Sequence, residues 1–154
     1  MDPLGTIHAA LGVASVAAGT AVVLQRKGTA RHRAFGWIYV VCMLGLNLTA
    51  LVMYRLTGTF NSFHATALLS LATLILGMLP TRARPFAGFF VARHAYFMAG
   101  SYVGVLAATT GQIITRLPGF PFAVGVFIAR SVVCSIGIYF ILDRIPGILR
   151  KLRR

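Results

Sequence analysis

The chain has 154 residues, of which 58% are hydrophobic and 11% charged, and its formal net charge is +13. A water-soluble domain of this size carries about 25% charged residues, so the composition excludes a soluble globule and predicts a membrane protein. The positive charge alone would suit nucleic acid, but the cations gather between apolar segments, which argues against that partner.

Five apolar segments each approach or exceed the roughly 20 residues that a helix needs to cross a bilayer. We expect transmembrane helices at about residues 7–24, 34–54, 62–79, 89–110 and 122–142. Almost no chain is left over, and only hydrogen-bonded helices are plausible for apolar runs of this length. We therefore predict a single transmembrane domain over residues 1–154, an all-α five-helix bundle with a basic tail at 143–154.

Turn-forming residues separate these segments. The first two helices are expected to close at glycines and the next two to stop at prolines, namely Gly28, Gly58, Pro80 and Pro118. Ser62 is a suitable N-cap for the third helix, and Pro146 is expected to interrupt the tail. The connections are short, which favours antiparallel neighbours.

Basic residues are distributed unevenly between the two sides of the predicted bundle. All but three fall in the first and third connections and in the tail, namely Arg26, Lys27, Arg31, Arg33, Arg82, Arg84, Arg93, Arg144, Arg150, Lys151, Arg153 and Arg154. By the positive-inside rule, this asymmetry predicts an N-terminus outside and a cytoplasmic C-terminus. The basic patches are expected to face anionic lipid headgroups.

Each of the first four segments carries one histidine near its N-terminal end, and the chain has no others: His8, His32, His64 and His94. In helices of alternating direction, His8 and His64 lie near one face of the membrane, and His32 and His94 near the other. One interpretation is that they are interfacial residues that reach headgroups and water. The other is coordination, because the positive end of a helix dipole suits a neutral imidazole better than a charged one.

The ligand chemistry of these histidines favours haem over a bare metal ion. Zinc and copper take further protein ligands, whereas the only acidic residues, Asp2 and Asp143, lie near the ends of the chain. Two imidazoles with no third protein ligand suit a six-coordinate haem. We therefore predict two haem b groups, one for each histidine pair. Cations near the sites that could meet the propionates are Arg31, Arg33 and Arg93 on the inner side and Arg55 or Arg116 on the outer.

Arg130 falls near the middle of the fifth segment, where a cation costs at least about 2.5 kcal/mol. It either snorkels or binds carbonyls of a neighbouring helix, or it binds a ligand with negative charge or a carbonyl, such as a propionate or a quinone. Both interpretations stay open.

Small residues recur beside the histidines. His8, Gly12, Ser15 and Gly19 share one helix face, and Gly36 follows His32 by one turn. Such positions allow either close helix packing or room for a flat macrocycle, and the Gly100-x-x-x-Gly104 pattern of the fourth segment favours packing.

Several histidine motifs resemble a known family. These are Ile7-His8, Lys27-Gly28-Thr29-x-x-His32-Arg33-x-x-Gly36-x-x-Tyr39, Phe60-x-x-Phe63-His64 and Arg93-His94-x-x-x-Met98-x-x-Ser101-Tyr102. Together they resemble an uncharacterised bacterial membrane family, domain of unknown function 2306, over the chain to about Leu106. That resemblance implies a multi-pass protein of the bacterial inner membrane and supports the importance of these positions without implying a mechanism.

The layout of one histidine per helix is also similar to the cytochrome b561 superfamily, whose four-helix core binds two haems and carries electrons across the membrane. This similarity implies that His8 and His64 bind an outer haem, and His32 and His94 an inner one. No ascorbate-site motif accompanies it, so the electron donor is left open.

The sequence therefore predicts a transmembrane di-haem b-type cytochrome that passes electrons across or within the membrane, with quinone as a candidate partner. It leaves open whether the protein is an oxidoreductase or an electron-transfer subunit. The alternative is a small non-enzymatic integral-membrane subunit that packs in a larger complex, with histidines contacting lipid, pigment or metal. The expected partners are membrane lipids and either other integral-membrane subunits or further copies of this chain.

Overall fold

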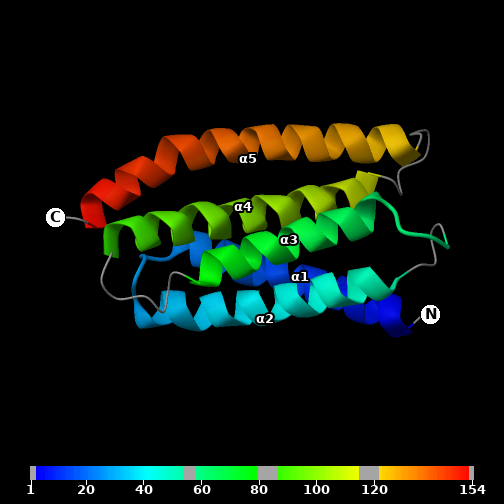
Figure 1. The fold of residues 1–154 in the computed structure, drawn as a ribbon, viewed down its shortest axis with the longest axis horizontal. Coiled ribbons are helices and arrows are strands. Elements are labelled where there is room, and N and C mark those ends of the chain that lie inside the picture. The colour runs from blue at the N-terminus through cyan, green and yellow to red at the C-terminus, as the bar shows by residue number, and fades with distance from the viewer. Residues whose placement is uncertain (1–2, 54–57, 80–86, 115–121, 153–154) are drawn as a thin grey trace. The chain divides into compact units, whose positions relative to one another are not determined.

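The computed structural model describes residues 3–53, 58–79, 87–114 and 122–152. Over these ranges the chain forms five helices, as predicted (Figure 1). They are α1 (Pro3–Leu24), α2 (Ala30–Val52), α3 (Ser62–Met78), α4 (Ala87–Ile114) and α5 (Phe122–Leu152). The prediction of an all-α chain is confirmed for these residues.

Four of the five helices are long and apolar enough to cross a membrane. The candidate spans are Pro3–Leu24, Ala30–Val52, Gly88–Ile114 and Val124–Lys151. Helix α3 has 17 residues and a length of roughly 26 Å, slightly less than the hydrocarbon core of about 30 Å. The length criterion is thus met by four of the five predicted transmembrane helices in the described part of the chain.

The chain divides into two compact units, Met1–Ala72 and Thr73–Arg154. The first is built on the hairpin of α1 and α2. The Leu11 side chain packs over Gly45, and the Leu46 side chain packs over Gly12. His8, one turn before Gly12 in α1, lies against Thr49, which follows Leu46 in α2, so the two helices run antiparallel. Buried residues follow along the same faces, namely Ser15, Ala18 and Gly19 in α1 and Tyr39, Val40, Met43 and Asn47 in α2. The glycine and serine stripe of α1 therefore serves close helix packing.

The second unit contains the hairpin of α4 and α5. Gly137 of α5 lies directly against the Val103 side chain of α4, and Gly111 of α4 lies beside Val126 and Arg130 of α5. By contrast, a Cβ atom added at Gly100 or Gly104 would meet no described atom within 4 Å. The expected Gly-x-x-x-Gly packing is thus not found among the described residues, and the close approach occurs at Gly137 instead.

Helix α2 begins earlier than predicted because Thr29 caps it. The Thr29 hydroxyl accepts a hydrogen bond from the His32 backbone N–H at 3.1 Å, which satisfies one of the free donors of the first turn. Gly28 has a positive φ of 81° in the turn before this cap. It therefore does not close α1, which already ends at Leu24.

The end of α1 is held instead by a lysine side chain. Lys27 donates hydrogen bonds from Nζ to the Val22 and Val23 carbonyls, at 2.7 and 2.8 Å. These carbonyls belong to the last turn of the helix, where backbone acceptors lack intrahelical donors. A cation at this position also complements the negative end of the helix dipole.

Two further predictions about helix ends need correction. Asn61, not Ser62, caps α3, because its Oδ1 accepts from the Phe63 backbone N–H at 2.8 Å. Helix α2 ends at Val52, so Gly58, which has a φ of 68°, lies well beyond it. Pro80 and Pro118 lie outside the described residues.

Helix α5 continues through Pro146 to Leu152, whereas the sequence predicted an end near residue 142 and a separate tail. A proline removes one backbone donor and clashes with the carbonyl four residues earlier, which bends a helix without necessarily ending it. Figure 1 shows such a bend in the C-terminal part of α5.

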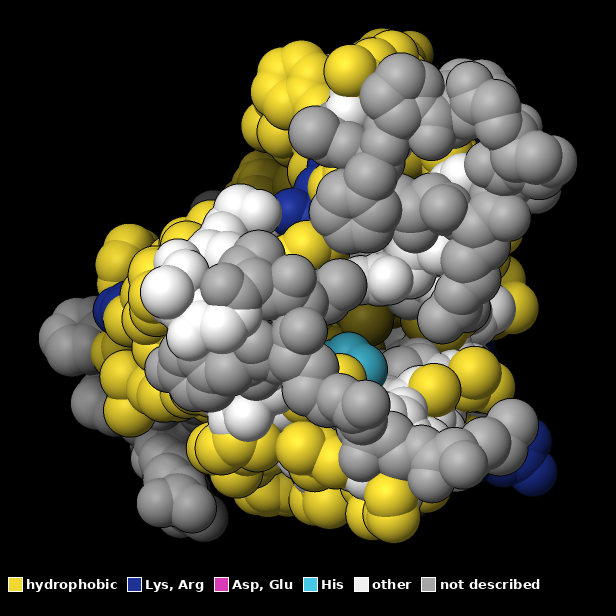
Figure 2. All heavy atoms as spheres, turned by 90° about the vertical axis from the view of Figure 1, so that its right-hand side faces the viewer, with side chains coloured by type: hydrophobic (Ala, Val, Ile, Leu, Met, Phe, Trp, Pro, Cys, Tyr) yellow, Lys and Arg dark blue, Asp and Glu magenta, His cyan; other side chains and the backbone are white. Residues whose placement is uncertain are grey.

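Most side chains on the described surface are apolar. Large exposed examples are Val13, Leu24, Val41, Leu69, Phe127 and Tyr139. Figure 2 shows one end of the molecule, where hydrophobic side chains dominate the coloured surface, with few cations and a histidine among them. A surface of this kind suits lipid rather than water.

Candidate functional site

His8 is the sixth residue of α1 and is joined to α2 by a hydrogen bond. Its Nδ1 lies 2.9 Å from Oγ1 of Thr49. The Thr49 hydroxyl in turn lies 2.8 Å from the Gly45 carbonyl and 2.9 Å from the Leu46 carbonyl of its own helix. A hydroxyl has one proton, which goes to these carbonyls, so Thr49 accepts from His8. The His8 proton is therefore on Nδ1, and Nε2 keeps its lone pair.

His94 is held in the same way in the second unit. Its Nδ1 lies 2.8 Å from the Gly77 carbonyl of α3. A carbonyl only accepts, so Nδ1 of His94 carries a proton, and in the neutral ring Nε2 keeps its lone pair. Gly77 belongs to the last turn of α3, where carbonyls have no intrahelical donor, so this bond also caps α3.

His64 is almost fully buried and has the opposite arrangement. Its Nδ1 accepts a hydrogen bond from the Asn61 backbone N–H at 3.2 Å. Since Asn61 is the N-cap of α3, this is a capping box in which histidine takes the place of glutamate or glutamine. A neutral imidazole that accepts at Nδ1 carries its proton on Nε2. The ring also stacks on Phe60, with centroids 5.3 Å apart and an interplanar angle of 30°.

His32 is the third residue of α2 and is partly buried. Because α1 and α2 are antiparallel, it lies at the opposite end of the hairpin from His8. A Cβ atom added at Gly36, one turn further along, would meet no described atom within 4 Å. The position one turn beyond His32 is therefore open, whereas the Leu46 side chain fills the corresponding position at Gly12.

Three of the predicted ligands belong to the first unit. His8 and His64 lie near the N-terminal ends of α1 and α3, which Figure 1 shows at the same end of α2, and His32 lies near the other end. The assignment of these two ends to opposite faces of a membrane stays a prediction. His94 belongs to the second unit, so its pairing with His32 stays a prediction.

The predicted arginines occupy different environments. Arg33 donates from Nη1 to the Gly28 carbonyl at 2.9 Å, and Arg31 is exposed. The Arg93 guanidinium lies 5.7 Å from the ring centroid of Phe97 on the same helix, at a distance typical of a cation–π contact. Arg55 and Arg116 lie outside the described residues.

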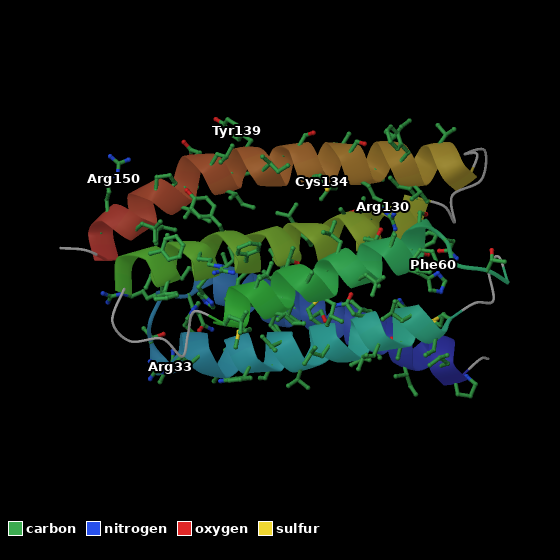
Figure 3. The ribbon with its side chains drawn as sticks, in the orientation of Figure 1. Arg33, Phe60, Arg130, Cys134, Tyr139 and Arg150 are labelled. Atoms are coloured by element: carbon green, nitrogen blue, oxygen red, sulfur yellow. The ribbon has the colours of Figure 1, made fainter. Side chains whose placement is uncertain are left out.

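Arg130 extends from α5 towards the C-terminal part of α4 (Figure 3). Its Nε would be 3.7 Å from a Cβ atom at Gly111, three residues before the end of α4. The last carbonyls of a helix and its dipole present negative potential, so this is a favourable position for a cation inside an apolar segment. The position favours the first interpretation of Arg130, as a partner of a neighbouring helix.

The histidines fit a haem unequally. An axial imidazole must present an unprotonated nitrogen, and a hydrogen bond from its other nitrogen fixes the tautomer and orientation. His8 and His94 meet both conditions through Nε2. His64 would meet them only after a change of tautomer that gives up its bond to Asn61. In the described ranges no three His, Cys, Asp or Glu side chains come together as a metal site.

Sequence reasoning missed three partners of the histidines. No sequence pattern pairs Thr49 of α2 with a histidine of α1, and Gly77 carries no side chain that could signal its role. Asn61 could have been found, because an N-cap residue followed three positions later by a side-chain acceptor is a capping-box pattern.

Comparison with known proteins places the chain in a family. A family model described as "Predicted membrane protein (DUF2306)" matches residues 5–145. No curated protein and no solved structure matches the chain. The match covers nearly all of the helices, and the chain therefore belongs to the DUF2306 family of predicted membrane proteins.

Proposed function

We propose that this protein is a transmembrane b-type cytochrome that binds two haems and passes electrons across or within the membrane, with quinone as its candidate redox partner. In this proposal His8 and His64 serve one haem, and His32 and His94 the other. Haem supplies reversible one-electron chemistry. The observation that carries the proposal is the hydrogen bonding of His8 and His94, which leaves Nε2 of each ring with a lone pair.

The two ends of the α1/α2 hairpin support separate sites. From His8 to the end of α1 is about 17 residues, or roughly 26 Å. The Thr49 hydroxyl and the Gly77 carbonyl each accept a hydrogen bond from an imidazole N–H, which orients the ring and raises the basicity of its other nitrogen. Arg31 and Arg33 are the cations near His32 that would meet propionates.

The proposal requires a rearrangement at His64. Its proton must move from Nε2 to Nδ1, and the Asn61 N–H then loses its acceptor. A lost capping interaction costs about 1 kcal/mol, which is small beside the strength of an axial metal bond. His64 is therefore the ligand whose local structure should change most when the site is loaded.

The proposal includes a topology of five crossings with the N-terminus outside and the C-terminus in the cytoplasm of a bacterial inner membrane. It is supported by the gathering of basic residues in the first and third connections and at the end of α5. Helix α3 would cross with slight local thinning of the bilayer, since a short hydrophobic helix costs only fractions of a kcal/mol per Å of mismatch.

The test is the absorption spectrum of the purified protein before and after reduction by dithionite. The proposal predicts a red protein with a reducible b-type spectrum and about two haems per chain. A well-folded but colourless protein, prepared from cells supplied with a haem precursor, would contradict it.

A second candidate function is a packing subunit of a larger membrane complex. It is favoured by the structural bonds of three histidines, since His8 joins two helices, His64 caps α3 from within and His94 caps its other end. This function predicts a colourless protein that co-purifies with another integral-membrane chain. Substitution of His8, His64 or His94 by alanine should destabilise it.

A further inference from the structure

The connection between α1 and α2 carries four cations that fall into two groups. Lys27 and Arg33 bind backbone carbonyls, Lys27 at the end of α1 and Arg33 at Gly28. Arg26 and Arg31 are exposed, and no hydrogen bond or ion pair from either guanidinium group to another described residue is found. The backbone carbonyl of Arg26 accepts a hydrogen bond from the Thr29 hydroxyl at 3.0 Å. The first pair thus shapes the connection, and the second pair faces outwards.

Among the described residues, no acidic side chain pairs with a cation of this connection. The first turn of α2 contains no acidic residue, and its dipole adds positive potential where Arg31 and Arg33 lie. Only two acidic residues occur in the chain, and Asp143 pairs with Arg144 at 3.0 Å in the second unit. Asp2 is separated from the connection by the 22 residues of α1. An external anion would therefore relieve the repulsion among these cations.

Apolar side chains continue directly from the charged connection. Leu24, the last residue of α1, is 80% exposed. On α2, Arg33, Trp37 and Val41 follow one another at intervals of four and so share a face, and Trp37 and Val41 are 55% and 63% exposed. Charge beside a long apolar stripe suits a molecule with an anionic head and hydrocarbon chains, whereas free phosphate or nucleic acid would leave the stripe uncovered.

We infer that the α1–α2 connection is a binding site for an anionic phospholipid, in which Arg26 and Arg31 bind the headgroup phosphate and the acyl chains lie along the Trp37–Val41 face. Backbone N–H groups of the first turn of α2 that lack intrahelical acceptors add to the attraction. Neither Arg26 nor Arg31 is an axial ligand in the proposed function, and Arg26 has no role in it at all. Arg31 is shared, because it is also a candidate partner of a propionate, so Arg26→Gln tests the lipid site separately from haem binding.

Trp37 is the only tryptophan of the chain and lies roughly 10 Å along α2 from the cations, so its fluorescence reports on this site. The full chain would be reconstituted in vesicles that contain phosphatidylglycerol or phosphatidylcholine with brominated acyl chains, which quench tryptophan on contact. We expect stronger quenching by the anionic lipid at equal mole fraction. A surface arginine contributes about fivefold to the affinity for an anionic membrane, so Arg26→Gln and Arg31→Gln should each lower this preference by about that factor.

The matched control is the double variant Arg150→Gln/Lys151→Gln, which removes two exposed cations from the end of α5. It should leave the lipid preference at Trp37 unchanged, and circular dichroism verifies the fold of every variant. Retention of the preference when millimolar inorganic phosphate is added supports a lipid ligand, and its loss would overturn that assignment. Equal quenching by both lipids, or an equal loss of preference in the control variant, would also overturn the inference.

Discussion

The hairpin of α1 and α2 differs from that of α4 and α5 in how polar groups enter the helix contact. In the first hairpin, His8 bonds to Thr49 across the interface, and buried Asn47 donates from Nδ2 to the Met43 carbonyl at 2.8 Å. In the second, the close contact is steric, between Gly137 and Val103, and Arg130 lies near the end of α4. A hydrogen bond between helices orients the imidazole ring of a histidine, whereas a steric contact only sets the distance between the helices. The α1–α2 contact therefore orients a candidate ligand, His8, whereas the α4–α5 contact serves packing.

The largest expected effect is the loss of haem when a histidine is substituted, whereas a substitution in α5 should cause no such loss. His8→Ala and His64→Ala should each remove one of two haems, and His32→Ala and His94→Ala should each remove the other, because a six-coordinate site loses an axial ligand. Haem per chain is measured as the pyridine haemochrome. Cys134→Ser in α5 is the control and should retain both haems. The ligand assignment fails if any single histidine variant keeps two.

The next effect tests the steric contact of the second hairpin. A Cβ atom at Gly137 would overlap the branched Val103 side chain, which has little freedom to move. Gly137→Ala should therefore lower the free energy of unfolding by about 1–3 kcal/mol, the usual cost of overpacking. Denaturant titration in a mild detergent measures it.

Gly104→Ala provides the comparison for Gly137→Ala, because a Cβ atom there meets no described atom within 4 Å. It should be neutral or slightly stabilising, since alanine favours a helix more than glycine does. If the two alanine variants had the same stability, the close approach at Gly137 would be wrong.

A smaller effect on stability is expected from loss of the hydrogen bond that orients His8. Thr49→Val removes the acceptor of His8 Nδ1 while keeping the side-chain shape, and it should lower the free energy of unfolding by about 1 kcal/mol. Thr49→Ser keeps the hydroxyl and should retain most of the stability. The ¹⁵N chemical shifts of the His8 ring should report protonation at Nδ1 in the parent protein and a mixture of tautomers in Thr49→Val. Protonation at Nε2 in the parent would contradict the assigned hydrogen bond.

The smallest effect concerns Lys27 at the end of α1. Burial lowers the pKa of its ammonium group below the ordinary value, so the folded chain releases this proton at a lower pH than the unfolded chain does. Between the lowered pKa and about 10.4, the unfolded state binds more protons, and the free energy of unfolding should rise slightly with pH. Thermal unfolding at alkaline pH measures this slope. The Lys27→Gln variant should lack this contribution of Lys27 to the pH dependence of the free energy of unfolding. If the slope is the same in that variant, the pH dependence comes from other groups.

The helices themselves were predictable because their apolar runs are long and uninterrupted. The errors arose at their ends, where charge and tertiary contact compete with hydropathy. Basic Arg31 and Arg33 suggested a loop, but the Thr29 cap draws both into α2. Pro146 suggested an end, yet α5 bends and continues.

The candidate site was predictable only in part. One histidine per helix could be read from the chain, and so could the alternation between faces that would separate His8 from His32. The tautomers of the histidines could not be predicted from the sequence, because they depend on hydrogen-bond partners in other helices or turns. These partners are Thr49 for His8, Gly77 for His94 and Asn61 for His64.

Paramagnetic resonance of the oxidised, purified protein tests most directly whether imidazole pairs hold two irons. The proposed ligation predicts two low-spin ferric signals of equal intensity, each abolished by substitution of a different histidine pair. A high-spin signal, a single low-spin species that survives Ala at His8 and His94, or the absence of any haem iron would contradict it.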